Sequence, residues 1–383
     1  MSFLKSLPNN RNRSFLVHSL IKSLGLLSSA NPENGQSATL RIIRPRLASV
    51  EELCLYHDKD YIDFVLNSGN ETASSHQNDC PPFPGLGRYV QMVAGATLSA
   101  AEALKSGNVD VAIAWDGGRH HAQKSKAAGF CYVADCIIAI LSLKRGSVLR
   151  IHPDRRKARI MYIDFDLHFS DAVSECFYKS ASAGNNAQVL TLSIHYTAPG
   201  FYPAHPLSSL PDITSPNSDP FTLSLPLKQG ASAKTFARIW GVVQDVKDVF
   251  KPDYVVVQCG ADGLAGDPHG IWNWSVGNEK GSMQWCVGEI IEKWETKVLL
   301  LGGGGYNSAN VARAWASLTS GALGRHFPPD TPIPDHIAFP LYSPSFTLDV
   351  PAGNMRDENS DDYLCEVEGV YRDIVCRLEE RCQ

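Results

Sequence analysis

The 383-residue sequence has no apolar stretch that reaches the roughly 18 uncharged residues of a membrane span. The segment Met1–Ser29 lacks the continuous apolar core of a signal peptide. Basic residues are not in excess either: 35 Lys and Arg face 40 Asp and Glu, for a formal net charge of −5. No overall positive field therefore draws the protein to nucleic acid or to anionic lipid. We expect neither a membrane nor a direct nucleic-acid partner, and a location in the nucleus, the cytoplasm or both.

The cysteines form no Cys-x-x-Cys pair, and the ten of them are spread from Cys54 to Cys382. A chain of this length buries its own core, so this spread fits a reduced intracellular protein better than a disulfide framework. There is also no internal repeat, low-complexity tract or linker. We expect one domain over residues 1–383, with a core at about 14–340. The polar segment 347–383 would pack on that core or be partly mobile, with a short helix near Val367–Arg377.

Short apolar runs rich in Val, Ile and Leu are typical of strands that are covered on both faces. Such runs occur at Val109–Trp115, Ala158–Ile163, Val189–Ile194, Tyr254–Cys259 and Lys297–Leu301. Helical patterns lie between or beside them, at Arg88–Lys105, Tyr132–Lys144, Ala233–Phe250 and Ser308–Leu323. The alternation predicts a single α/β domain with a central, mostly parallel, multi-stranded sheet and helices on both faces. In such sheets the chemistry gathers at the carboxyl ends of the strands.

The first candidate site lies directly after one predicted strand, where Asp164, Asp166 and His168 alternate along the chain. On an extended backbone all three side chains point to one side. Two carboxylates and an imidazole suit zinc, or Fe(II) or Co(II) under other supply conditions. A capped turn with Asp171 as N-cap is the alternative for an isolated Asp-x-His. The further motifs favour the metal.

The second candidate is His120-His121 after the turn Gly117-Gly118, just past the first predicted strand. Adjacent histidines can bind a metal, transfer protons or be coincidental. Their place at a strand end favours an active site. A histidine that is not a ligand needs a carboxylate to fix its tautomer, and Asp164 and Asp171 are available for this.

Two glycine-rich turns complete the pattern. Asp262, within Gly260–Gly266, could be a turn cap; as a third ligand beside Asp166 and His168 it would leave one position open for water. Four glycines precede Tyr306, and no Lys-Ser/Thr follows them as a phosphate-binding loop requires. A phenol on that turn could donate a hydrogen bond to an oxyanion.

Together these motifs resemble the class I histone deacetylase family, within the arginase–deacetylase fold. The resemblance extends from about Val17 to Ala338. It also includes Gly129-Phe130-Cys131-Tyr132 and Pro199-Gly200-Phe201-Tyr202-Pro203. It implies a zinc site made by Asp166, His168 and Asp262, and a catalytic histidine pair, His120 and His121, backed by Asp164 and Asp171. Tyr306 would be the transition-state tyrosine.

The resemblance implies roles for further residues. The acetyl-lysine tunnel would be lined by Gly129, Phe130, Tyr202, His269 and Gly304, with Asp79 at the rim to hold the main chain of the substrate. Arg13 would line an internal channel behind the metal. A potassium ion would lie near Asp164, Asp166, His168, Ser193 and Ile194.

Some residues depart from the family pattern. Phe169-Ser170 replace a common His-Gly, so we expect altered packing without loss of the metal. Arg119 stands where an apolar residue is common, and its charge could lower the basicity of a neighbouring histidine. Tyr202 adds a hydroxyl to a common Phe. Pro268 in Gly-Asp-Pro resembles the histone deacetylase 8 type and not the Gly-Asp-Arg of corepressor-bound members. A corepressor complex bridged by inositol phosphate is therefore not expected.

The leading interpretation is zinc-dependent hydrolysis of acetyl-lysine on a protein substrate, either a histone or a cohesin subunit. Zn²⁺, or Fe²⁺ in cells, and K⁺ would be the cofactors. An acetylpolyamine amidohydrolase remains an alternative, as does a catalytically weak scaffold that binds acetyl-lysine. An arginase-like enzyme with two metals would need further Asp and His ligands. The loop His205–Phe221 has no assigned role.

Overall fold

The computed structural model describes residues 12–27, 40–67, 79–145, 157–180 and 188–382. In this part of the chain, six parallel strands form one sheet in the order β1-β6-β5-β2-β3-β4. The strands are β1 (Val111–Ala114), β2 (Ile160–Asp164), β3 (Val189–Tyr196), β4 (Thr222–Leu227), β5 (Tyr254–Gln258) and β6 (Lys297–Leu301). The five predicted strands are confirmed, and the sheet is entirely parallel within these residues. The edge strand β4 was not predicted.

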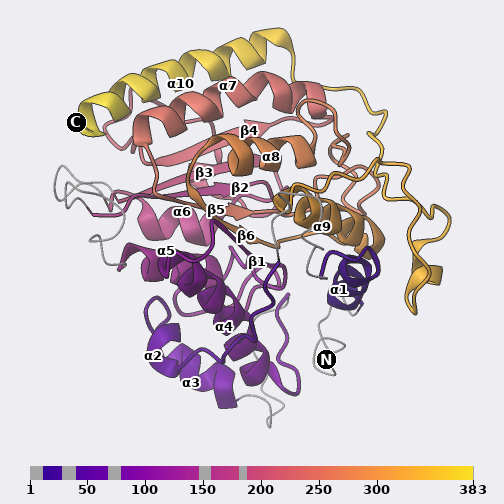
Figure 1. The fold of residues 1–383 in the computed structure, drawn as a ribbon. Helices are drawn as coiled ribbons and strands as arrows, with labels where there is room; N and C mark the ends of the chain where they lie inside the picture. Colours follow the sequence, from indigo (N-terminus) through magenta and orange to yellow (C-terminus); the bar gives the residue numbers. More distant parts are fainter. Residues whose placement is uncertain (1–11, 28–39, 68–78, 146–156, 181–187, 383) are drawn as a thin grey trace.

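Helices cover both faces of the sheet, as expected for the α/β class (Figure 1). They are α1 (Arg13–Ser23), α2 (Val50–Leu53), α3 (Lys59–Asn67), α4 (Leu86–Lys105), α5 (Asp135–Lys144), α6 (Asp171–Phe177), α7 (Ala233–Phe250), α8 (Met283–Lys293), α9 (Ser308–Ala322) and α10 (Asp361–Cys382). Short 3-10 helices lie at Pro206–Ser208 and Phe339–Tyr342. None of the helices in the described ranges is both long and apolar enough to cross a membrane.

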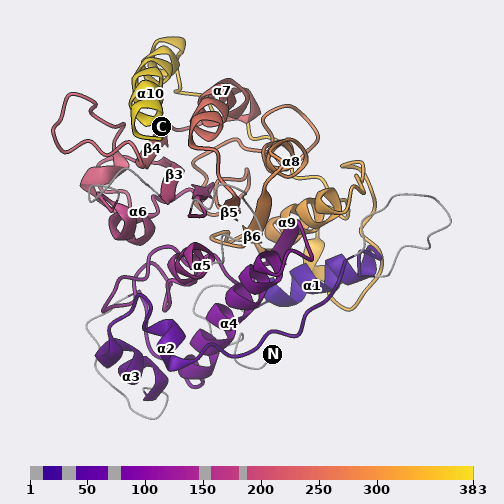
Figure 2. The ribbon, with the colours of Figure 1, turned by 60° about the vertical axis from the view of Figure 1, so that its left-hand side comes forward.

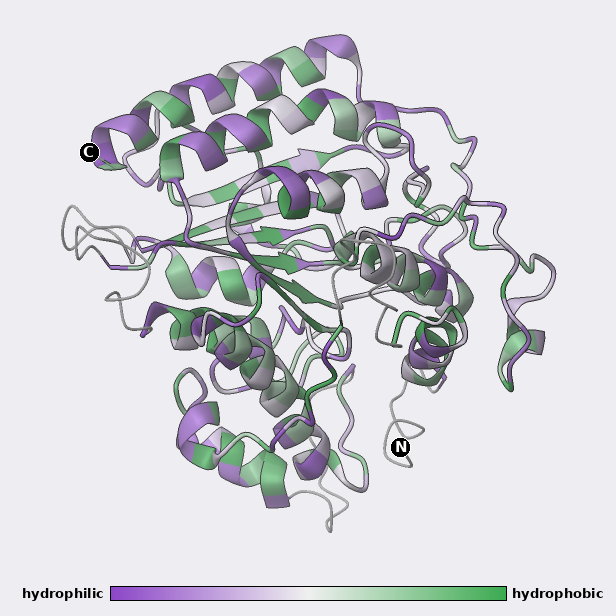
Figure 3. Ribbon diagram, in the orientation of Figure 1, coloured by the Kyte–Doolittle hydropathy of each residue, from purple (hydrophilic) through white to green (hydrophobic). Residues whose placement is uncertain are grey.

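The two faces of the sheet belong to separate hydrophobic clusters, because successive side chains of a strand point to opposite sides. On β2, Met161 and Ile163 pack with the layer of α1, α7, α8, α9 and α10, whereas Ile160 and Tyr162 pack with α4, α5 and α6. The strands β1, β2, β5 and β6 are accordingly mostly hydrophobic, and the outer sides of α7 and α10 are polar (Figure 3). Burial on both faces makes the apolar runs continuous.

The C-terminal helix is longer than the sequence pattern indicated. α10 spans 22 residues and lies along α7 in both views of the ribbon (Figures 1 and 2). Its buried side chains recur at spacings of three and four: Leu364, Val367, Tyr371, Ile374 and Leu378. The segment has a low overall hydropathy, so this narrow apolar stripe was not recognised in the sequence. A helix on the outside of the domain needs only one such stripe to pack against it.

The start of α5 also differs from the prediction, at Asp135 instead of Tyr132. The Asp135 carboxylate accepts hydrogen bonds from the Gly118 and Arg119 amides, at 3.0 and 2.7 Å, and from the Thr97 hydroxyl. These bonds attach the start of α5 to the turn that carries the histidine pair. The first residue of α5 thus fixes the turn before the histidine pair through its carboxylate.

A buried histidine outside the site makes the stability of the fold pH-dependent. His57 donates from Nδ1 to the Lys124 carbonyl and accepts at Nε2 from the Ala134 amide, at 3.2 and 2.9 Å. Burial lowers the pKa of His57 from 6.5 to about 4, so the unfolded chain binds this proton first. The contribution is complete above pH 6.5 and is lost as the pH falls towards 4.

We expect the free energy of unfolding to fall by about 3 kcal/mol over this range on account of His57. Urea unfolding at a series of pH values measures the loss in the wild type and in His57→Gln, which cannot titrate. The acid-induced loss should be shallower in the variant. Parallel curves for the two proteins would contradict this role.

Candidate metal centre and active site

The candidate site lies at the carboxyl ends of β2 and β5, which are neighbours in the sheet. After β2 the chain builds β3 and β4 on one side, and it then returns to build β5 and β6 on the other. The segments after β2 and β5 thus emerge where the strand order reverses, which is the usual position of a site in open α/β sheets (Figure 1). The loops after β1 and β6 reach the same region.

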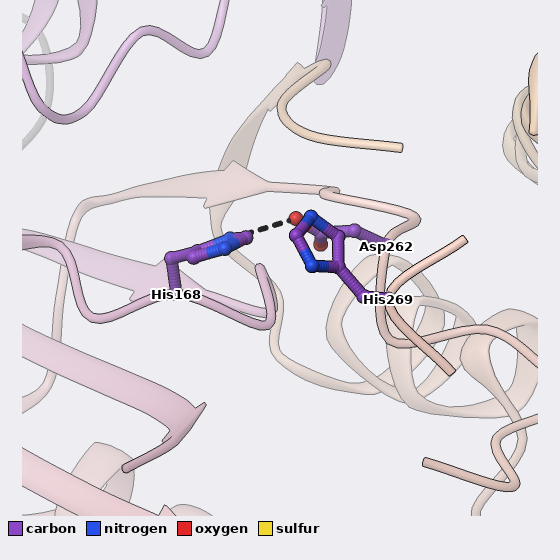
Figure 4. A group of neighbouring side chains, drawn as sticks. All are labelled: His168, Asp262 and His269. Carbon is purple, nitrogen blue, oxygen red and sulfur yellow. Dashed lines mark hydrogen bonds and ion pairs between the residues drawn. The ribbon is translucent and has the colours of Figure 1, made fainter. Parts of the chain in front are cut away.

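Three predicted ligands meet at this point. Nδ1 of His168 lies 3.1 Å from Oδ1 of Asp166 and 2.9 Å from Oδ2 of Asp262. All three side chains are buried. Figure 4 shows the His168 ring directed at the Asp262 carboxylate. Asp166, His168 and Asp262 therefore present one nitrogen and two oxygen atoms to a common centre, a donor set that suits zinc or Fe(II).

The two carboxylates are held by backbone and side-chain donors. The Gly304 amide and the Gln258 amide group donate to Oδ2 of Asp166, at 2.7 and 2.9 Å, and the Leu167 amide donates to Oδ1 of Asp262 at 2.9 Å. A Cβ at Gly304 would lie 2.3 Å from Oδ2 of Asp262. Only glycine fits at position 304, so the glycine run carries the backbone to the ligands.

Electrostatics favours a cation at this centre. Burial and the negative charge of Asp166 raise the pKa of Asp262 to about 7. Two carboxylates held together in a buried site repel each other, and a divalent cation between them removes that cost. The residues present therefore fit the metal that the sequence implies.

The histidine pair has the carboxylate partners that were predicted. Nδ1 of His120 lies 2.8 Å from Asp164, and Nδ1 of His121 lies 2.7 Å from Asp171. The Tyr162 hydroxyl donates to Asp164 as well. With Nδ1 of His121 donating to Asp171, Nε2 is left as an acceptor.

The two histidines differ in protonation. Burial lowers the pKa of His120, but the carboxylates of Asp164 and Asp166 outweigh it and raise the pKa to about 9. Burial and the positive charge of His120 lower the pKa of His121 below its usual value. His120 is therefore the more basic of the two rings, and His121 is neutral at neutral pH. The expectation that Arg119 would reduce the basicity of its neighbour does not hold for His120, because nearby carboxylates dominate.

Tyr306 lines the same cavity and keeps its proton. Burial and the charges of Asp262 and Asp166 raise the pKa of its phenol. Its backbone amide donates to Oδ2 of Asp267 at 2.7 Å, and the Asn307 amide donates to the same oxygen. Asp267 thus fixes the position of Tyr306. The sequence pattern did not single out this role, although the Gly-Asp-Pro motif marked the residue.

Aromatic rings surround the ligands. Tyr202 packs against His121, with ring centroids 5.0 Å apart, and is 41% exposed, which places it at the mouth. Phe130 lies across from Tyr306 at 6.4 Å. Phe201 stacks on the His168 ring at 5.2 Å and was not predicted as a site residue. In the sequence, only its position next to Tyr202, a predicted wall residue of the tunnel, could have identified Phe201.

Gly129, which lines the cavity, is hydrogen-bonded to Asp79. The Gly129 amide donates to Oδ2 of Asp79 at 2.7 Å. Gly129 has a φ of 53°, and a Cβ there would lie 2.4 Å from the His121 ring. The residue must therefore be glycine for the chain to pass over the histidine.

His269 lies beside the ligands on an exposed loop. Its ring centroid is 4.8 Å from that of His168 and 4.9 Å from that of Tyr306. His168, Asp262 and His269 each offer a ligand atom within 4.8 Å of the others (Figure 4). The predicted pocket-lining position is accordingly close enough for its nitrogen to approach the metal centre.

Two arginines line the cavity. Including its open mouth, the cavity encloses about 370 Å³ and is bounded by residues that include Arg13, Arg119, His121, Phe130, His168 and Tyr306. Arg13 donates to the Gly305 carbonyl at 3.0 Å and lies over the Trp315 ring. Burial and the positive charge of Arg119 lower the pKa of Arg13 to about 10.

The remaining predicted residues lie behind the ligands. The ring of Phe169 is buried against His195 and His205, which agrees with the expectation that this departure affects packing. The Ser193 hydroxyl contacts Nδ1 of His195 at 3.0 Å, and Ile194 is buried in the same strand. The potassium site stays a prediction.

The structure combines a parallel α/β sheet with a candidate His/Asp metal site that is flanked by a histidine pair and a tyrosine, an arrangement expected of a metal-dependent α/β hydrolase. The family model that describes the histone deacetylase domain matches residues 8–322 of this sequence. The chain is 35% identical over 369 residues to Histone deacetylase 8 of Danio rerio, covering 94% of this chain and 88% of the relative. It is 33% identical over 367 residues to Histone deacetylase 1 of Homo sapiens, covering 93% and 69%.

The chain belongs to the histone deacetylase family, and its relatives are consistent with class I. A similar match, 33% over 364 residues, covers 89% of Histone deacetylase 8 of Xenopus tropicalis. The chain is thus a hydrolase of a family that acts on acetylated lysine in proteins and generally depends on a metal.

Proposed function

We propose that the protein is a zinc-dependent lysine deacetylase that is active without a partner protein. The observation that carries the proposal is the convergence of Asp166, His168 and Asp262, two of which line the same cavity as a neutral His121. When bound, zinc would polarise the amide carbonyl and make a water nucleophilic near neutral pH. In cells, the same three residues would also bind Fe²⁺.

The protein's own groups divide the remaining work. His121 would take a proton from the attacking water at Nε2 and then give a proton to the lysine nitrogen, while Asp171 holds its tautomer. His120, which is hydrogen-bonded to Asp164, would set the local field. The phenol of Tyr306, which remains protonated, would donate to the oxyanion.

The substrate side of the site consists of aromatic walls and a polar rim. Phe130, Tyr202, Gly129 and Gly304 would contact the aliphatic part of the acetyl-lysine side chain, and His269 would contact the adjoining part of the substrate. Asp79, on the rim beside Gly129, would bind its main chain. We propose a histone or a cohesin subunit as the substrate, with action in the nucleus, the cytoplasm or both, and a potassium ion near Ser193.

Independence from a corepressor rests on Pro268, where corepressor-bound relatives have arginine. We expect the purified, metal-loaded chain to hydrolyse an acetylated peptide at the same rate with and without inositol phosphate. Initial rates measured over a titration of inositol hexakisphosphate check this. Turnover that begins only after inositol phosphate and a corepressor are added would contradict it.

The experiment that tests the function compares acetyl-lysine peptide and acetylspermidine as substrates of the isolated, zinc-loaded protein. We expect turnover of the peptide, and we expect it to be abolished in His121→Ala with the zinc content unchanged. A preference for acetylspermidine would identify a polyamine amidohydrolase. Binding of the peptide without hydrolysis of either substrate would identify a scaffold.

A further inference from the structure

The cavity carries positive charge to which the proposed hydrolysis of a neutral acetyl group assigns no role. Arg13 and Arg119 both line it, and their guanidinium groups are near enough for Arg119 to lower the pKa of Arg13. Burying two like charges beside each other is costly unless an anion accompanies them. The neighbouring carboxylates are the first candidates for that anion.

Nearby carboxylates are occupied by other donors. Asp135 accepts from the amides of Gly118 and Arg119 and from the Thr97 hydroxyl. Asp116 contacts the His18 ring at 3.4 Å. Among the described residues no ion pair joins either carboxylate to the guanidinium of Arg119 or Arg13. The charges of both carboxylates favour the cationic form of Arg119, but neither carboxylate accepts a hydrogen bond from its guanidinium.

Arg119 itself has unused hydrogen-bonding capacity. Its Nη2 donates to the Asp116 carbonyl at 3.3 Å. Its Nε is buried and has no hydrogen-bond partner in the described part of the chain. A buried donor without a partner is uncommon, and a guanidinium donates to a carboxylate through two parallel N–H groups. A carboxylate that reached this guanidinium would give the Nε group the partner that it lacks.

The cavity also contains the reacting groups. His121, His168 and Tyr306 line it together with the two arginines. An acyl group whose carbonyl lies between Tyr306 and the metal ligands can thus extend its far end towards Arg119 and Arg13. The guanidinium groups would therefore contact the far end of the acyl group and not the lysine.

We infer that the inner cavity selects acyl groups that end in a carboxylate, such as malonyl-, succinyl- or glutaryl-lysine. This inference rests on the proposed function, because the same hydrolysis takes place. Water adds to the acyl carbon, the C–N bond breaks, the lysine nitrogen gains a proton, and a dicarboxylate leaves. Arg119 and Arg13 bind the distal carboxylate before and after the bond breaks, so that no further co-reactant is needed.

The experiment uses the zinc-loaded full chain and one peptide that carries acetyl-, malonyl-, succinyl- or glutaryl-lysine in turn. The matched control for each acidic acyl group is the same acyl group with its terminal carboxylate replaced by a neutral carboxamide. We expect at least one acidic acyl group to have a kcat/KM on the order of tenfold or more above that of its carboxamide. The difference should lie mainly in KM.

Two variants test the assignment to Arg119. Arg119→Leu should remove the preference for the acidic chain over its carboxamide, and Arg119→Lys, which retains the charge without the fork, should retain part of it. Zinc content and melting temperature show whether each variant is folded. Because the comparison of acidic and neutral chains needs no variant, it remains valid if Arg119→Leu does not fold.

The outcomes separate this inference from the proposed function. Hydrolysis of acetyl-lysine with no advantage of any acidic acyl group over its carboxamide would overturn the inference and leave the deacetylase proposal standing. A preference that survives in Arg119→Leu would also overturn it. Failure to hydrolyse any of the peptides would contradict both.

Discussion

Tyr306→Phe is expected to lower kcat roughly a hundredfold or more while leaving zinc content and melting temperature unchanged. The Tyr306 backbone stays anchored on Asp267 in this variant, because that bond uses the main-chain amide. Only the hydroxyl is lost, so the proposed oxyanion would have one hydrogen-bond donor fewer. Steady-state kinetics with an acetyl-lysine peptide measures the effect.

The matched control is Tyr363→Phe. Its hydroxyl donates to the Pro226 carbonyl at 2.5 Å, away from the cavity, so this variant also loses a single phenol hydrogen bond. We expect its kcat to stay near that of the wild type. A Tyr306→Phe enzyme that is as active as this control would remove Tyr306 from the mechanism.

Asp262→Asn is expected to purify folded but without stoichiometric zinc, and to be inactive. The carboxamide keeps the size of the side chain and lacks the charge that a divalent cation requires. Loss of a partner behind a ligand already costs about 10–100-fold in metal affinity, so loss of a ligand should cost more than that. Elemental analysis and competition with a chelator measure the affinity.

His269→Ala is the informative comparison. His269 lies within reach of the same centre, but it is exposed, whereas Asp166, His168 and Asp262 are buried. We expect zinc affinity in His269→Ala to stay within about threefold of the wild type, because three buried ligands hold the ion. Equal loss of zinc in the two variants would show that His269 is a ligand and that the predicted set of ligands is incomplete.

The sequence predicted the site better than the periphery, for physical reasons. Asp164, Asp166 and His168 follow a buried strand at a period of two, and burying three such groups on one side is costly unless they share a charged partner. The histidine pair and the glycine run lie at strand ends as well. Parallel strands place all their carboxyl ends on one edge, so local patterns were enough to bring distant segments together.

The missed features depend on tertiary contacts. β4 contains Pro226 and Ser224, which weaken a strand pattern but are tolerated at the sheet edge. α1 has apolar residues around much of its circumference and packs against α9, so its amphipathic signal is weak. Phe201 and Asp267 act on His168 and Tyr306 through contacts that no local spacing indicates.

The structure gives Arg119 a different role from the one that the sequence suggested. From the sequence it was a departure that could weaken the neighbouring histidine. In the structure it is one of two cationic walls of the cavity, with one donor unsatisfied. We infer that this residue affects which acyl group the site accepts and leaves the histidine pair itself unchanged.

The measurement that tests the central claim most directly is hydrolysis of an acetyl-lysine peptide by the purified protein before and after metal removal. The account predicts turnover that a chelator abolishes and that one equivalent of Zn²⁺ or Fe²⁺ restores, in the absence of any partner protein. Turnover that persists after complete removal of the metal, or no turnover in the fully zinc-loaded protein, would contradict it.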